Sequence, residues 1–235
     1  MKRCIASIAF RDPYVGYQTY FMKSLQAIGN TIPVVSWTDE YPPNSPTHQA
    51  TNYAFKFFAL QECRRRGFES VLWLDCSCYF HGPLEPFFDE IEREGHYFLV
   101  CADRLGNWTS DNALEYFGMT RDEAMEKLLL CGTIYGFDFT NPRTQAFFDH
   151  WGKTLVDGVW GQLYGGSYKD EGSYVSRISK DPRCQGHRSD EVCATVVAER
   201  LGMKTVTMGL FGGGIKRGEG VIVNSGYDLG QRKTL

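Results

Sequence analysis

The sequence YAFKFFALQECRRRGFESVLWLDCSCYF, residues 53–80, contains two hydrophobic periods in succession. In its first part apolar residues recur three and four positions apart up to Gly67, which predicts a helix over about 51–67. The run VLWL at 71–74 is apolar at every position, as in a strand that is buried on both faces. Asp75 follows where this strand would leave the core. A carboxylate at that place needs a hydrogen bond, an opposite charge or a bound cation.

Strands and helices alternate on both sides of this stretch. We expect strands at 3–10, 33–37, 71–75, 96–102, 131–138 and 204–208, and further helices at 15–29, 83–95, 120–129, 144–155 and 189–202. This order predicts an α/β fold: a single Rossmann-like domain over residues 1–235, with a mostly parallel central sheet flanked by helices and a Gly-rich C-terminal segment at 209–235. Ligands of such sheets bind beyond the carboxyl ends of the strands, and Asp75 is expected at one of those ends.

The composition sets limits on the function. A chain of 235 residues with 43% hydrophobic content can build one sizeable core, and a formal charge of −3 gives no general affinity for nucleic acid or anionic membranes. The charge is uneven, because residues 1–163 carry 14 basic and 20 acidic side chains while 164–235 carry 11 and 8. An anionic ligand is therefore expected toward the C-terminal third.

We expect neither an export signal nor a membrane-spanning segment. The start MKRCIASIAF has no export-signal layout, and no apolar run approaches the roughly 20 residues of a membrane-spanning helix. The eight cysteines form no CxxC pair, which favours free thiols in a reducing compartment. We therefore expect a cytoplasmic protein with no membrane partner.

Two common nucleotide-binding motifs are missing. FRDPYVGY stands after the first strand instead of GxGxxG, and GxxxxGK[ST] does not occur. The Gly-rich stretch FGGGIKRGEG at 211–220 carries Lys216 and Arg217 and fits a phosphate-binding loop as well as a solvated turn.

The stretch at 53–80 resembles the segment of GT-A nucleotide-sugar glycosyltransferases in which a Lys-bearing helix leads into a strand of the form hhhhDxD. CGTIYGFDF at 131–139 is similar to the strand of that family whose small residues face the sugar and the acceptor. HRSDEVCATVVAERLG at 187–202 is similar to the helix that opens at the reaction centre. The resemblance implies a GT-A-like domain, with a donor site that includes Lys56, Asp75, Cys76, Ser77, Gly132 and Thr133.

The resemblance also implies Mn²⁺ or Mg²⁺ at Asp75, bridging the two phosphates of the donor. Ser77 stands where the second Asp of the motif would be, and a neutral hydroxyl is a poor ligand for these hard cations. We therefore expect a weaker metal dependence than in relatives with both carboxylates. Lys216 and Arg217 would be an alternative source of positive charge.

Asp190, His187 and Lys56 each allow a functional and a structural interpretation. Asp190 lies in the first turn of a predicted helix, where it would be an ionised base for an acceptor hydroxyl or an ordinary capping acid. His187 would assist as a base or a ligand, or be a surface residue of a loop. Lys56 would reach the donor if the resemblance holds, whereas its helical phase favours a solvated position.

Three residues at the end of the first strand are candidates for contacts with the nucleotide. Phe10, Arg11 and Tyr14 would frame a nucleobase by stacking and charge. A buried aromatic corner explains Phe10 equally well.

The leading hypothesis is a glycosyltransferase that moves a hexosyl or pentosyl group from a nucleotide-diphosphate sugar to the hydroxyl of a glycan or small molecule. One alternative is a phage-type enzyme that acts on hydroxymethylated bases of DNA, since SYVSRISKDPRCQGHR at 173–188 is locally basic. Another is an inactive relative that binds a nucleotide or a carbohydrate without turnover.

Overall fold

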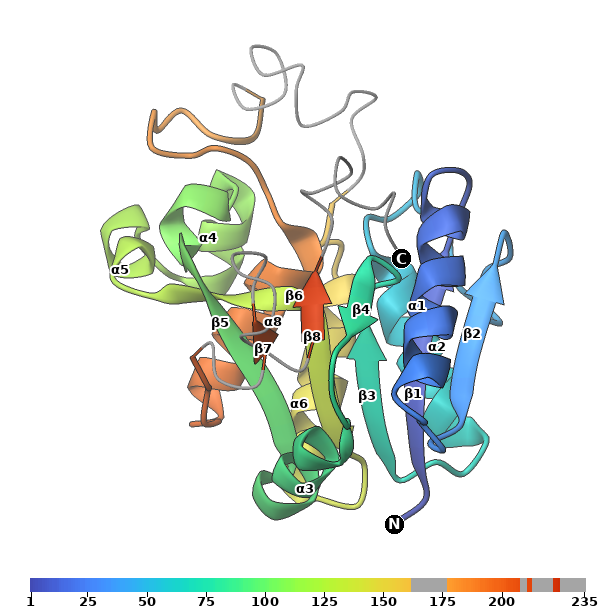
Figure 1. Ribbon diagram of the computed structural model, residues 1–235. Helices are drawn as coiled ribbons and strands as arrows, with labels where there is room; N and C mark the ends of the chain where they lie inside the picture. The colour runs from blue at the N-terminus through green and yellow to red at the C-terminus, as the bar shows by residue number, and fades with distance from the viewer. Residues whose placement is uncertain (162–176, 208–210, 213–221, 225–235) are drawn as a thin grey trace.

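The computed structural model describes residues 1–161, 177–207, 211–212 and 222–224 (Figure 1). Its helices and strands in chain order are β1 (Arg3–Ala9), α1 (Tyr14–Ala27), β2 (Val34–Thr38), α2 (Ala54–Arg65), β3 (Ser70–Leu74), β4 (Cys78–Phe80), α3 (Glu85–Glu94), β5 (His96–Arg104), the 3₁₀ helix η1 (Leu105–Trp108), α4 (Asp111–Phe117), α5 (Arg121–Met125), β6 (Leu128–Asp138), α6 (Pro142–Val156), α8 (Ser189–Arg200), β7 (Phe211–Gly212) and β8 (Ile222–Asn224).

The central sheet has five strands in the order β2-β1-β3-β6-β5. Strand β1 pairs in parallel with β2 and β3, whereas β6 runs antiparallel to both β3 and β5. Four of the five strands therefore point the same way and β6 opposes them. The predicted α/β fold with a mostly parallel sheet is confirmed.

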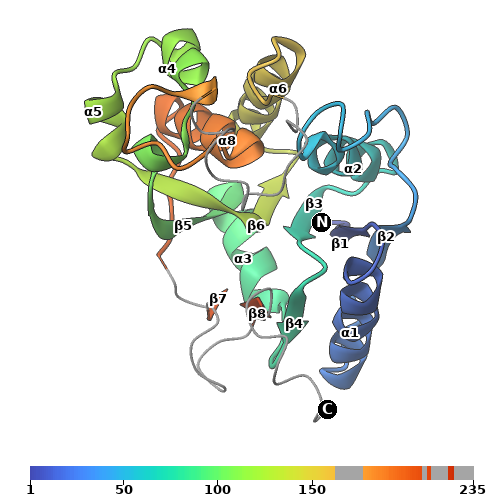
Figure 2. The same ribbon diagram turned by 90° about the horizontal axis from the view of Figure 1, so that it is seen from above.

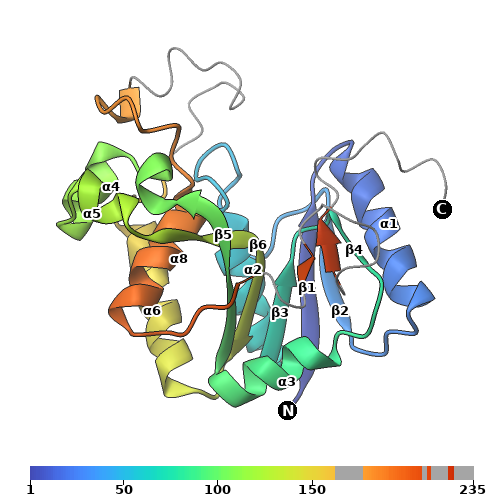
Figure 3. The same cartoon turned by 60° about the vertical axis from the view of Figure 1, so that its left-hand side comes forward.

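The alternation of side chains along β3 divides the core into two layers. Val71 and Trp73 face a cluster formed with α2, α6 and α8, and Leu72 and Leu74 face a second cluster formed with α1 and α3. Figures 2 and 3 show these helix groups on opposite faces of the sheet. Because both faces are covered, β3 carries apolar residues at every position, which explains the run in the sequence.

A second, three-stranded sheet joins β4 to the C-terminal strands in the order β4-β8-β7. Cys78 of β4 is the register partner of Asn224 in β8. Strand β4 begins three residues after Asp75, so the C-terminal part of the chain returns to the segment that follows the end of β3 (Figure 1).

The helix expected over 120–129 is wrong in length. The predicted capping box between Thr120 and Glu123 is present, but α5 ends at Met125 and β6 begins at Leu128. Residues Leu128 and Leu130 pair with β5, and this sheet pairing overrides the helical pattern. The strand expected at 204–208 is reduced, within the described 204–207, to an isolated bridge between Val206 and Leu99.

Two further observations concern the environment of the chain. Within the described residues, no helix combines the length and the apolar character needed to cross a membrane. All eight cysteines are free thiols.

We predict that Gly136→Ala lowers the free energy of unfolding by about 1–3 kcal/mol, the usual cost of overpacking a core. A Cβ at Gly136 in β6 would lie 2.5 Å from Ile91 Cγ1 and 2.7 Å from Tyr97 Cβ. The control is Gly16→Ala in α1, where a Cβ meets nothing within 4 Å and should add about 0.5–1 kcal/mol by helix propensity. Urea denaturation measures both variants. Equal effects of the two substitutions would contradict the packing at β6.

Candidate active site

Asp75 leaves the core directly after β3, and its carboxylate has two protein partners. Trp73 Nε1 donates a hydrogen bond to Asp75 Oδ1 at 3.1 Å, and Lys56 Nζ lies 3.6 Å from the same oxygen. The backbone N–H of Asp75 donates to Thr133 O at 2.9 Å, which holds this turn against β6. About a third of the Asp75 side chain is exposed. The carboxylate is therefore stabilised on one side and open on the other.

Lys56 lies in the first turn of α2 and is 3% exposed. Its Nζ donates to Gly132 O at 2.8 Å and lies 3.0 Å from Asp190 Oδ2. The solvated position suggested by helical phase is therefore wrong. From the start of α2, Lys56 contacts the end of β3, the middle of β6 and the start of α8.

The surroundings of Lys56 keep it charged. Burial alone would lower the pKa of the Lys56 ammonium, but Asp190 and then Asp75 raise the pKa above its usual range. Three aromatic rings also face the ammonium, with centroids 5.0 to 6.0 Å away, from Tyr53, Trp73 and Tyr135. Cation–π attraction to these rings adds to the stabilisation of the charge.

Two adjacent carboxylates open α8. Asp190 is 2% exposed, and burial raises the pKa of its carboxyl while Lys56 opposes this shift. Glu191 Oε1 accepts a hydrogen bond from Gly132 N at 2.9 Å, and burial together with the charge of Asp190 raises the pKa of Glu191 to about 7. The side chain of Asp190 is directed at Lys56, so pairing rather than helix capping explains its position.

Gly132 is held at both polar atoms of its backbone, by Lys56 at the carbonyl and by Glu191 at the N–H. A Cβ at this position would lie 2.8 Å from Glu191 Cγ and 3.0 Å from Asp190 Oδ2. Only glycine lets β6 approach the start of α8 this closely.

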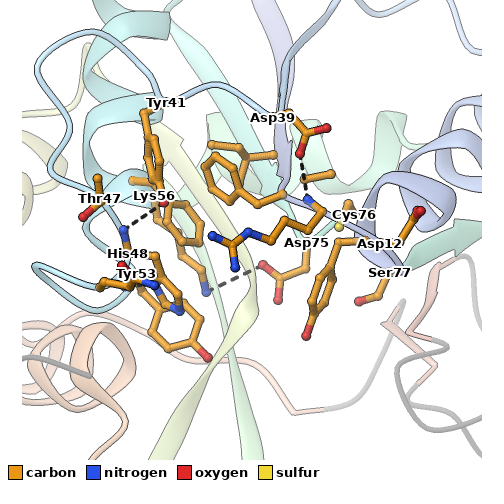
Figure 4. Close-up of a pocket in the computed structure, with 17 residues that line it drawn as sticks. Asp12, Asp39, Tyr41, Thr47, His48, Tyr53, Lys56, Asp75, Cys76 and Ser77 are labelled. Carbon is orange, nitrogen blue, oxygen red and sulfur yellow. Dashed lines mark hydrogen bonds and ion pairs between the residues drawn. The ribbon is translucent and has the colours of Figure 1, made fainter. Parts of the chain in front are cut away.

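A pocket of about 690 Å³ opens beyond the carboxyl ends of β1 and β3 (Figure 4). The structure brings together in its wall seven of the predicted donor-site residues: Phe10, Arg11, Tyr14, Lys56, Asp75, Cys76 and Ser77. Gly132, Thr133 and Asp190 do not line it and connect to it through Lys56 and Asp75. Lys216 and Arg217 lie outside the described residues.

The segment between β2 and α2 forms a wall that the sequence interpretation missed. It contributes Asp39, Tyr41, Thr47, His48, Gln49 and Tyr53. Two features of the sequence could have indicated this wall. The segment follows β2, whose carboxyl end lies at the same edge of the sheet as that of β1, and it combines aromatic and polar residues in a proline-rich loop.

One end of the pocket is aromatic. The ring of Phe10 lies 4.2 Å from that of Tyr41 and 5.5 Å from that of Phe55, between centroids. The N–H of Arg11 donates to Asp39 Oδ1 at 2.7 Å, which links the ends of β1 and β2.

Three pocket residues other than glycine have a left-handed backbone: Arg11 with φ of 58°, Asp39 with φ of 56° and Tyr53 with φ of 56°. This conformation is uncommon for side chains of such size.

His48 is held in one neutral form. Its Nδ1 accepts a hydrogen bond from Tyr53 N at 3.0 Å, and its backbone N–H donates to Tyr41 Oη at 3.0 Å (Figure 4). Burial and then the charge of Lys56 lower the pKa of His48 to about 4. The imidazole is therefore uncharged at neutral pH, with its proton on Nε2.

His187 is 5% exposed, so the expected surface position is wrong. Its Nε2 lies 2.9 Å from Val159 O and its Nδ1 lies 3.3 Å from Ser110 N, while burial lowers its pKa to about 4. Because backbone groups occupy both ring nitrogens, His187 fixes the segment that precedes α8, and we assign it no part in the chemistry.

Within the described part of the chain, the set of protein ligands for a divalent cation is incomplete. No three His, Cys, Asp or Glu side chains there form a group that could hold a metal ion. At Asp75, Oδ1 is engaged by Trp73 and Lys56, so the ammonium stands beside the carboxylate where a cation would bind. Mg²⁺ and Mn²⁺ take several of their roughly six ligands from water and substrate phosphates, so the poor fit here lies at Asp75, whose carboxylate is already paired with Lys56.

We predict that Lys56→Met destabilises the fold by about 3–5 kcal/mol, because it leaves Asp190 buried without its counter-charge. In the double variant Lys56→Met/Asp190→Asn a large part of this loss should return, since the unpaired charge is gone. Urea denaturation of both single variants, the double variant and the parent completes the cycle. Strictly additive effects would contradict a direct pairing of the two side chains.

A second prediction concerns the pH dependence of stability. The folded-state pKa of Glu191, about 7, lies above its ordinary value of 4.5, so between these values the folded state retains a proton that the unfolded state has released. The contribution of Glu191 to the free energy of unfolding should therefore fall as the pH rises from 4.5 to 7 and level off above, while the partly buried His48 and the buried His187 contribute in the opposite direction because their pKa values are lowered. The stability of Glu191→Gln relative to the parent should therefore increase over this range, and Glu115→Gln, at an exposed position, should follow the parent. An identical pH profile of stability in all three proteins would contradict the assignment.

Comparison with known proteins bears on the fold. No protein-family model and no curated protein matches the sequence. Among solved structures, the chain is similar to the crystal structure of mouse xyloside xylosyltransferase 1 in its apo form, with a TM-score of 0.51 and 9% sequence identity. The match covers 97% of this chain and 98% of that one. The GT-A-like α/β fold expected from the sequence is thus one that a glycosyltransferase adopts.

Proposed function

We propose that the protein is a glycosyltransferase, which moves a sugar from a nucleotide-diphosphate donor to an acceptor hydroxyl. The observation that carries this proposal is the junction at Lys56, which joins Asp75, Gly132 and Asp190 beside a pocket of about 690 Å³. These residues belong to the three segments that resemble GT-A enzymes, and they meet at one edge of the sheet. The fold shared with a xylosyltransferase supports the same class of reaction.

The pocket offers a distinct environment to each part of such a donor. The rings of Phe10 and Tyr41 provide apolar faces for a nucleobase. The open side of the Asp75 carboxylate would accept hydrogen bonds from sugar hydroxyls, with Cys76 and Ser77 beside it in the wall. The donor would thus extend from the end of β1 to the end of β3.

Lys56 is proposed to supply a fixed positive charge near the donor diphosphate. Departure of the nucleoside diphosphate builds negative charge on its phosphate oxygens, and a buried cation that needs no reorganisation stabilises that charge. No step is assigned to a divalent cation, and the dependence of the rate on Mn²⁺ or Mg²⁺ is proposed to be weak.

Asp190 is proposed to orient Lys56 rather than to act as the acceptor base. A base must come within about 2.6–3.2 Å of the hydroxyl that it deprotonates. Asp190 is almost fully buried and its Oδ2 is paired with Lys56, so the carboxylate fixes the ammonium and balances its charge.

The alternative of a DNA-modifying enzyme loses support in the described residues. Arg183 pairs with Asp181 and Asp122, and Arg188 pairs with Asp103 and Glu191. Two of the four basic side chains in the 173–188 stretch are thus neutralised within the protein, which leaves fewer charges for phosphate contacts.

The test measures thermal stabilisation and release of nucleoside diphosphate across a panel of nucleotide sugars. We expect at least one donor to raise the melting temperature and to be slowly hydrolysed. Asp75→Asn and Asp190→Asn should each keep the fold and most of the donor affinity but lower turnover by roughly 10²-fold. The control Asp149→Asn removes an exposed carboxylate outside the pocket and should change neither.

Two results would contradict this proposal in different ways. Binding without any hydrolysis or transfer would identify an inactive nucleotide- or sugar-binding relative. If no nucleotide sugar stabilises the protein, the pocket does not bind such donors.

A further inference from the structure

Arg11 differs from the other basic groups of the pocket in having no acidic side-chain partner among the described residues. Lys56 is paired with Asp190 and Asp75, and His48 is partly buried and accepts a hydrogen bond at Nδ1 from the Tyr53 N–H. Of the basic side chains in the described pocket wall, this leaves the Arg11 guanidinium available to a ligand.

The backbone of Arg11 has a defined conformation and a hydrogen-bond partner. The residue follows directly after β1 and has a left-handed φ of 58°, a conformation that costs about 1–3 kcal/mol for a residue other than glycine. Its N–H donates to Asp39 Oδ1 at 2.7 Å, and this hydrogen bond connects it to the end of β2. The side chain of Arg11 therefore starts from a fixed backbone position in the pocket wall, beyond the carboxyl end of β1, where the crevice of an α/β sheet binds ligands.

Because several side chains of the pocket wall are acidic, an anion must be bound there by direct contacts. Asp12, Asp39 and Asp75 also line the wall, so the pocket has no overall positive field to attract an anion. A guanidinium can still bind a phosphate strongly through two parallel hydrogen bonds, which depend on geometry more than on the distant field.

We propose that the Arg11 guanidinium binds the diphosphate of the donor directly and neutralises it without a protein-held divalent cation. This proposal rests on the glycosyltransferase function and on the incomplete metal-ligand set at Asp75. In the reaction, the bond between the anomeric carbon and the diphosphate oxygen breaks, and its electron pair stays on that oxygen. Arg11 would stabilise the charge on the departing nucleoside diphosphate together with Lys56.

The experiment is calorimetric titration with inorganic pyrophosphate, UDP, GDP and ADP, and with the matching nucleosides, in the presence of EDTA. We expect pyrophosphate and at least one nucleoside diphosphate to bind without metal and to bind more weakly as the salt concentration rises. Arg11→Ala should weaken diphosphate binding roughly 10- to 100-fold and leave nucleoside binding unchanged, and Arg11→Lys should lose less. Lys23→Ala, an exposed cation of α1 that does not line the pocket, is the matched control and should have no effect.

Two variants of Asp39 distinguish the effect of its hydrogen bond from the Arg11 N–H from the effect of its negative charge. Asp39→Asn keeps an oxygen that can accept from the Arg11 N–H and removes a negative charge, so diphosphate affinity should stay equal or rise. Asp39→Ala removes the acceptor and should weaken binding. If charge alone mattered, both variants would bind more tightly, and the role of the backbone link would be wrong.

The outcomes distinguish this proposal from the function on which it rests. Diphosphate binding that requires Mn²⁺ or Mg²⁺ and is unaffected by Arg11→Ala would overturn the role of Arg11 and leave the glycosyltransferase proposal intact. Absence of nucleotide, nucleotide-sugar and pyrophosphate binding, with and without metal, would overturn both.

Discussion

The arrangement of this site depends on one buried ammonium. Lys56 is almost inaccessible to solvent, yet it stays charged because a backbone carbonyl, two carboxylates and three aromatic rings surround it. These partners come from the start of α2, the end of β3, the middle of β6 and the start of α8, so the charge of one side chain sets the relative positions of these four segments. An unpaired ammonium at this depth would cost several kcal/mol, so the partners contribute to the stability of the fold as well as to the proposed site.

The same cluster contains more negative than positive groups. Asp75, Asp190 and Glu191 lie around Lys56, Arg188 pairs with Glu191 and Asp103, and the raised pKa of Glu191, about 7, relieves part of the negative excess. The charge state of the site is thus coupled to pH through a residue that does not line the pocket. Coupled groups of this kind titrate as a unit, and the pH behaviour of the protein belongs to the cluster rather than to one carboxylate.

The sequence contained much of the fold, because the decisive elements have strong patterns. The helix and the buried strand in residues 53–80 differ in hydrophobic period, and Asp75 could be nominated from its position alone. Lys56 could not be resolved in the same way: helical phase describes one helix, whereas its burial results from β6 and α8 packing over it. His48 was missed because its place in the pocket wall depends on a hydrogen bond from the Tyr53 N–H within a loop that has no periodic pattern. The end of α5 was misplaced because pairing with β5 decided it.

The left-handed residues at the pocket have a consequence for how this protein could change over generations. Arg11, Asp39 and Tyr53 occupy conformations in which glycine would be less strained, so the chain forgoes stability at three points around one cavity. A substitution to glycine at any of them would remove backbone strain but would also delete a side chain from the wall and free the loop. Such positions define a trade-off between stability and function. Selection for heat resistance alone would therefore favour the loss of these side chains from the pocket wall before any change in the two packed layers of the core.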